Sequence, residues 1–171
     1  LQLYQSGGLC VTTIKADHEF EHIRGRLTTH TVMLNETARD EHVPEVERYI
    51  RTIKERTRGA YNTLPFKRMP PRLVIEMVRN SVFWLNAFPH RLGVSETGSP
   101  RVIITGRGID HNRHCRYDFG ENVQTHEQHD NSMAPWTIGA LALRPTGNAQ
   151  GNYYFYSLST GLVINRAHAT K

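Results

Sequence analysis

The sequence predicts an incomplete α/β domain followed by a small module of β-strands. Two short β-branched runs come first, at 9–17 and 30–38, as expected of buried strands. Two helical patterns follow at 44–61 and 73–88, with proline at or just before the start of each. From about Tyr117, short apolar or alternating runs are separated by turn sequences such as PTGN and STG, which indicates antiparallel strands.

Composition narrows the possible classes of protein. The chain has 171 residues, 38% hydrophobic and 22% charged, which allows a buried core in one domain or in one domain with a smaller second one. No apolar run approaches a membrane span, and Leu1 does not open a signal peptide, so we expect no membrane partner. Cys10 and Cys115 are the only cysteines, which argues against a disulfide scaffold and favours an intracellular setting.

Positive charge is concentrated in the middle of the chain. Residues 48–116 hold 14 Lys and Arg against 4 Asp and Glu, whereas residues 1–47 hold 4 basic and 8 acidic side chains. A solvated surface needs no such segregation, and a basic region is what a protein that binds nucleic acid requires. The distribution therefore favours a polyanionic partner.

The N-terminal region is predicted to contain one helix end and two strands. LQLYQSGG is typical of a helix that ends at Gly7-Gly8. The run LCVTTIKAD is a buried strand that ends at Asp17, and HTVMLNETA at 30–38 is a second strand.

The helix predicted from Pro44 carries two neighbouring stripes. The first is apolar and is expected to be buried; it contains Val46, Ile50 and Ile53. The second has one acid followed by cations: Glu47, Arg51, Lys54 and Arg58. This second stripe is explained either by i,i+4 ion pairing on a solvated helix or by an acid with a chemical role at the head of a basic surface.

The second helix pattern, LVIEMVRNSVFWLNAF, places Leu73, Met77, Asn80/Ser81 and Trp84 on one face, widened by Val74, Val78 and Leu85. Prolines and glycines interrupt the chain after it. We expect three parts: a domain over 1–95, a linker over 96–116 and a small β-barrel module over 117–171.

Asp17 and Glu47 are the candidate catalytic and metal-binding residues. Functional groups in α/β sheets concentrate at the carboxyl ends of strands, where Asp17 is placed. A second carboxylate on the first turns of a nearby helix can share divalent cations with it, and Mg²⁺ takes such oxygen ligands. Spacing alone is a weak signal for this site.

The same segments resemble the integrase region of copia-type retrotransposon polyproteins. IKADHEFEHIR is similar to the segment in which a strand ends in Asp and Glu-Phe follows shortly. EHVPEVERYIRTIKERTR resembles the helix that bears the third catalytic acid, and its Glu47-Arg48 matches the Glu-Arg of that helix. FWLNAFPHRLGVSETGSPRVIITG, the later Phe119-Gly120 and the stretch TIGALALRPTGNAQGNYYFYSLSTGLVINR follow in the same order, so the resemblance covers nearly the whole chain.

The resemblance implies the C-terminal part of a ribonuclease-H-like catalytic core followed by a small barrel. Such an enzyme is a polynucleotidyl transferase that processes and joins DNA ends with two Asp and one Glu around Mg²⁺ or Mn²⁺. Asp17 is then the second acid and Glu47 the third, while Arg51, Lys54 and Arg58 lie along the DNA.

The sequence departs from the family pattern in two respects. The first Asp and the family's zinc-binding module fall before Leu1, and Val43-Pro44 replaces the usual Asn-Gly. Glu41 and Glu45 remain alternatives to Glu47. Element ends and target DNA are the expected partners, the nucleus is the expected place of action, and a homo-oligomer is possible. The alternative is a non-catalytic nucleic-acid-binding or assembly module from a decayed element.

Other candidate residues have simpler explanations. One histidine-rich group matches no common zinc spacing, so surface or loop histidines are expected; it contains His111, His114, Cys115, His126 and His129. Four arginines lie in a loop-rich segment that could touch DNA phosphates: Arg101, Arg107, Arg113 and Arg116. In the YYFY run at 153–156 a strand with one buried face is expected, rather than a platform that stacks on bases.

Overall fold

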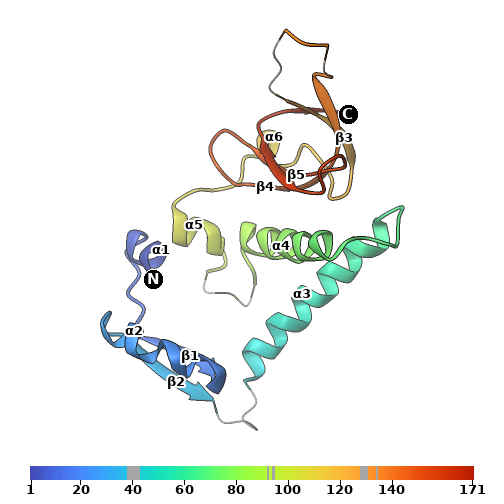
Figure 1. The fold of residues 1–171 in the computed structure, drawn as a ribbon. Helices are drawn as coiled ribbons and strands as arrows, with labels where there is room; N and C mark the ends of the chain where they lie inside the picture. The colour runs from blue at the N-terminus through green and yellow to red at the C-terminus, as the bar shows by residue number, and fades with distance from the viewer. Residues whose placement is uncertain (38–42, 92, 94, 128–130, 134) are drawn as a thin grey trace. The chain divides into compact units, whose positions relative to one another are not determined.

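The computed structural model describes residues 1–37, 43–91, 93, 95–127, 131–133 and 135–171, and it is a mixed α/β structure (Figure 1). By its contacts the chain forms two compact units. Unit 1 contains 1–51 and 89–107, and unit 2 contains 52–88 and 108–171. The predicted division at 95 and 117 stays a prediction.

Unit 1 is built around a pair of parallel strands. Strand β1 (Thr13–Asp17) and strand β2 (Met33–Thr37) pair in register from Thr13↔Met33 to Asp17↔Thr37. The 3-10 helix η1 (His18–Ile23) and helix α2 (Arg24–Thr28) connect them. Because the strands are parallel, both end at the same edge of the sheet, so the chain leaves β2 where Asp17 lies.

The remaining helices of unit 1 are short. Helix α1 (Gln2–Ser6) ends at Gly7, as the sequence predicts. Helix α5 (Pro100–Thr105) begins in the Ser-Pro pair, where Ser99 Oγ accepts a hydrogen bond of 3.2 Å from the Val102 N–H. Buried Leu27, Val32 and Leu34 form the small core.

Helix α3 (Pro44–Thr63) confirms the predicted helix, but its apolar stripe is not buried as expected. Val46 is 51% exposed and Ile50 is 46% exposed, while Ile53 is half-buried. Apolar spacing defines a face that can be covered; it does not supply the partner that covers it. In unit 2, Thr57 of α3 donates a hydrogen bond of 3.1 Å to Ser81, so the C-terminal half of α3 contacts a neighbouring helix.

That neighbour is helix α4 (Pro71–Ala87), which begins at Pro71 in the first helical position. The predicted face is largely confirmed, because Leu73, Met77, Asn80 and Ser81 are buried. Val74 and Val78 were expected to widen this face and are instead exposed. Among the helices of the described segments, none has the length and apolarity that crossing a membrane requires.

The rest of unit 2 is a five-stranded antiparallel sheet in the order β6-β5-β4-β3-β7. Its strands are β3 (Asn122–His126), β4 (Thr137–Pro145), β5 (Tyr153–Ser157), β6 (Val163–Arg166) and β7 (Ala169–Thr170). Along β5 the burial alternates as expected: Tyr153, Phe155 and Ser157 are buried, and Tyr154 and Tyr156 are half-exposed. The core cluster contains Val123, Ala140, Ala142, Tyr153 and Phe155.

The prediction of a closed barrel is wrong. In the part of the chain that the structure describes, no ladder joins β6 to β7 or β3, so the sheet is open. The sheet is nevertheless curled. Strands β6 and β7 form its opposite edges, and the two residues between them in the chain, Ala167 and His168, can connect these edges only if the edges lie close together. Arg166 of β6 reaches across this opening: its Nε donates to the His126 carbonyl at 3.2 Å and its Nη2 to Glu127 at 2.7 Å.

Candidate acidic site and basic helix

Asp17 occupies the position that the sequence predicts, at the carboxyl end of β1. Its Oδ1 accepts a hydrogen bond of 2.7 Å from the His18 N–H, and Asp17 thereby caps η1. Asp is a preferred residue at a helix N-cap, which explains why the strand turns into helix at this residue. The side chain is exposed to solvent.

A second carboxylate, Glu36, lies near the end of β2 and was not singled out from the sequence. It is in register with Ala16 on the paired strand. Arg24 donates to Glu36 and also binds Glu21 at 2.8 Å, and His18 Nδ1 lies 3.2 Å from Glu36. Because these basic partners already engage Glu36, it belongs to a surface ion-pair network, which explains its geometry without a metal.

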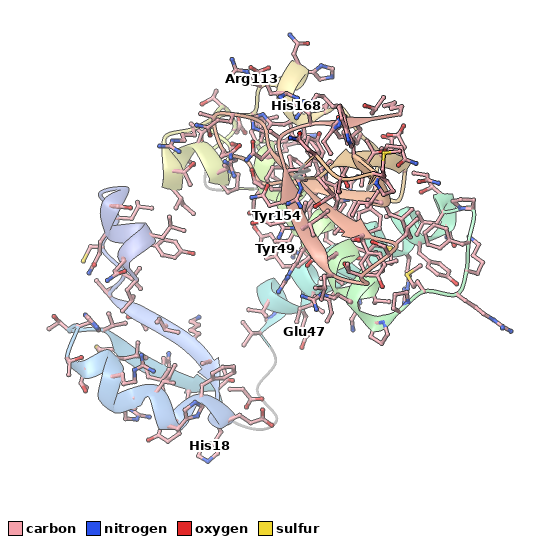
Figure 2. All side chains as sticks on the ribbon, turned by 45° about the horizontal axis from the view of Figure 1, so that its top comes forward. His18, Glu47, Tyr49, Arg113, Tyr154 and His168 are labelled. Atoms are coloured by element: carbon pink, nitrogen blue, oxygen red, sulfur yellow. The ribbon has the colours of Figure 1, made fainter. Side chains whose placement is uncertain are left out.

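Glu47 lies in the first turn of α3 and is exposed; its backbone N–H donates to the Val43 carbonyl at 3.1 Å (Figure 2). The alternative acid Glu41 lies outside the described residues, and so does the side chain of Glu45. Among the described side chains in the first turn of α3, Glu47 is therefore the only acid.

Asp17 and Glu47 have the type of donor atom that a divalent cation requires, because Mg²⁺ binds carboxylate oxygens. They do not complete a site. Within 1–37, 43–91 and the other described segments, no three His, Cys, Asp or Glu side chains lie together in positions to hold a metal ion. The metal-binding role of Asp17 and Glu47 therefore stays a prediction.

The predicted basic residues Arg51, Lys54 and Arg58 recur along α3 and are all exposed. None of the three makes an ion pair with another residue that the structure describes. Cations without acidic partners remain free to neutralise phosphates. The three side chains therefore have the solvent exposure that binding to a nucleic-acid backbone requires.

The histidine-rich segment does not form a metal cluster within the described residues, and His129 lies outside them. His111 and His126 are exposed as expected. The prediction of a surface or loop histidine is wrong for His114, which is only 3% exposed. Its Nε2 lies 2.9 Å from the Asn148 carbonyl and its Nδ1 lies 3.1 Å from the Asp110 amide nitrogen. Helix α6 (His111–His114) is therefore fastened to the β4–β5 connection by a histidine with a structural role.

The loop arginines differ in availability. Arg116 donates to the carbonyls of Gly151 and Ala167 and lies 5.5 Å from the ring centroids of Tyr117 and Tyr153. Arg113 lies in the neighbouring helix and donates to the Ala149 carbonyl at 2.5 Å (Figure 2). Because these contacts hold the sheet together, Arg116 and Arg113 have structural roles.

Glu76, which the sequence pattern did not single out, is 2% exposed. It pairs with Arg79 at 2.6 Å and with Arg144 of β4 at 3.4 Å. The Arg144 guanidinium lies 4.3 Å from the centroid of the Tyr154 ring, on the sheet of unit 2 (Figure 2). The available signal was that Glu76 neighbours Met77 and Asn80 on the face of the helix predicted to be buried.

Comparison of the chain with family models finds no family that matches. Comparison with curated proteins likewise finds no match.

Proposed function

We propose that the chain is part of a copia-type retrotransposon integrase and acts on DNA through metal-dependent phosphoryl transfer. The observation that carries the proposal is the geometry of unit 1. Asp17 ends a strand of a parallel pair, and the chain leaves that same edge shortly before the helix that bears Glu47. In α/β proteins this edge is where ligands bind.

In this proposal Asp17 and Glu47 hold Mg²⁺ or Mn²⁺ together with a third carboxylate that the described residues do not provide. The bound metal supplies activation of the attacking hydroxyl and stabilisation of the leaving oxygen. The chain's own basic residues Arg51, Lys54 and Arg58 bind and orient the DNA backbone. Water and then a DNA 3′-hydroxyl are the nucleophiles in the two steps.

Calorimetry with Mg²⁺ and Mn²⁺ tests the acidic site, using the chain extended upstream by its own reading frame. We expect binding that Asp17→Asn and Glu47→Gln each abolish, because each removes a negatively charged ligand. Glu19→Gln serves as the control, since Glu19 is an exposed acid of the adjoining η1 helix. Metal affinity that is the same in all three variants contradicts the assignment.

A non-catalytic nucleic-acid-binding module is the second candidate. The exposed cations of α3 favour it, since they need no metal to bind phosphates. This candidate predicts DNA affinity that chelation of Mg²⁺ leaves unchanged, together with no DNA-joining activity in the extended chain. Strand transfer by that chain rules it out.

A further inference from the structure

Unit 2 contains an open groove that neither the acidic site nor the sheet explains. It lies where the end of α3 and the following segment meet the start of α4, and it has a volume of about 520 Å³. Its lining residues are Thr57, Arg58, Tyr61, Lys67, Arg68, Met69, Val74 and Met77. All of them belong to one compact unit, so the groove is a feature of unit 2 alone.

The lining combines an apolar floor with a basic rim. Met69 and Val74 supply thioether and aliphatic surface beside the buried Met77, and Val74 is 42% exposed. Arg58 and Arg68 are exposed, and neither makes an ion pair with a described residue. Among the described residues that line the groove, none is acidic. A complementary ligand is therefore apolar in its centre and negatively charged at its ends.

The contacts of Lys67 within the groove bear on the kind of ligand that can bind there. Its Nζ donates to the carbonyls of Tyr61, Asn62 and Leu64 at 3.2–3.3 Å, at the end of α3. The same Nζ lies 5.0 Å from the Tyr61 ring centroid, and the Tyr61 hydroxyl donates to the Lys67 carbonyl at 3.1 Å. Tyr61 is thus held against Lys67, which covers a face of its ring.

This arrangement favours a peptide over a nucleotide base. A base binds by stacking on an aromatic face, and Lys67 already occupies one face of the Tyr61 ring in this groove. Methionine side chains are flexible and polarisable, which suits them to aliphatic side chains of varied shape. We propose that the groove docks a short segment of a partner protein in which aliphatic residues are flanked by Asp or Glu. This function differs from the proposed action on DNA, and Arg58 belongs both to the basic stripe of α3 and to the groove.

Fluorescence anisotropy with a labelled peptide of sequence EELLEE tests the proposal on the whole chain. We expect saturable binding below about 1 mM, as for a small groove. The peptides EESSEE, without the aliphatic centre, and KKLLKK, with reversed charge, are expected to bind at least about tenfold more weakly, because each removes one form of complementarity.

Matched pairs of variants locate the site. Val74→Asp is expected to weaken EELLEE binding about tenfold, and Arg68→Glu about threefold to tenfold. Val78→Asp and Arg72→Glu alter exposed residues of the same helix that do not line the groove, and they leave the affinity within about twofold. Circular dichroism confirms that each variant keeps its helices.

The proposal is overturned if EELLEE does not bind the folded chain, or if Val74→Asp and Val78→Asp change its affinity equally. It is also overturned if a single-stranded oligonucleotide displaces the peptide and loses affinity on Val74→Asp, which would make the groove a nucleic-acid site. Loss of DNA binding in Arg51 or Lys54 variants with unchanged EELLEE affinity supports a peptide-binding function distinct from DNA binding.

Discussion

Glu76 on α4 and Arg144 on β4 form an ion pair between helix and sheet inside unit 2, with 3.4 Å between Oε2 and Nε. The side chain of Glu76 is 3% exposed and that of Arg144 is 18% exposed. Because the carboxylate also binds Arg79, it is one acid shared by two cations. Burying these charged groups costs desolvation energy, which their mutual attraction offsets, so removal of one group leaves the other without compensation.

Replacing Glu76 by Gln is predicted to lower the free energy of unfolding by about 3 kcal/mol, since Arg144 then keeps its charge in a half-buried position without an acid. Urea unfolding followed by circular dichroism measures the change. Glu55→Gln on the exposed side of α3 is the control and is expected to change stability by less than about 0.5 kcal/mol. Equal effects of the two substitutions contradict the prediction.

Tyr153→Phe is predicted to cost about 1–2 kcal/mol, because the buried hydroxyl accepts from the Arg116 N–H at 2.9 Å and donates to the His114 carbonyl. Tyr156→Phe alters the neighbouring half-exposed tyrosine of β5 and is expected to be nearly neutral. Thermal unfolding of both variants provides the comparison, and a neutral Tyr153→Phe shows that these hydrogen bonds contribute nothing net.

The same tyrosine predicts a dependence on alkaline pH. Burial raises the pKa of Tyr153 above its usual value of 10.0, against the opposing effect of the Arg116 N–H. Above pH 10 the unfolded chain releases this proton more readily than the folded chain, so stability falls as the pH rises. The stability advantage over Tyr153→Phe should therefore shrink from pH 9 to pH 11; an advantage that grows over this range contradicts the assignment.

Gly151→Ala is predicted to destabilise unit 2 through two effects. The backbone φ of +73° costs a side chain about 1–2 kcal/mol, and the new Cβ lies 2.8 Å from the Cβ of Arg113. Gly161→Ala shares only the first effect, since its φ is +68° and its nearest contact is 3.5 Å away. Chemical unfolding should show a larger loss for Gly151→Ala by about 1–3 kcal/mol. Identical losses indicate that the contact with Arg113 relaxes freely.

DNA affinity is predicted to fall with salt because exposed cations on α3 displace counterions from phosphates. Arg51→Ala and Lys54→Ala should each reduce the slope of log affinity against log salt by about one unit. Lys15→Ala alters an exposed cation of β1 and should leave the slope unchanged. Anisotropy with a labelled duplex at several salt concentrations gives the slopes, and a slope of zero for the unaltered chain rules out backbone contacts.

The sequence predicted those elements that local chemistry determines. Proline at the start of α3 and α4, the β-branched run before Asp17 and the alternation in β5 each belong to one segment and are found in the structure. The burial of Val46 and Ile50 was wrong because it required a partner surface elsewhere in the chain. Glu76 and His114 were missed for the same reason, since their partners are far from them in sequence.

The candidate site was predictable only in part. The strand end at Asp17 and the exposed helix bearing Glu47 follow from local pattern. The ion pairs that engage Glu36 do not, because they depend on the register of β1 with β2 and on the position of Arg24. The groove was likewise invisible in the sequence, because it arises where two helices and the segment between them meet.

Pairing of the first strand of the sheet with the last, β3 with β7, has a consequence for synthesis of the protein. On the ribosome, β3 emerges with one side unpaired, and Gln124 and Thr125 receive their partners on that side only when Ala169 and Thr170 have been made. Four strands can assemble as a meander as they appear, but pairing of the fifth strand, β7, with β3 closes a loop of more than forty residues. Folding of the sheet in unit 2 is therefore completed only after β7, its last strand, has been translated.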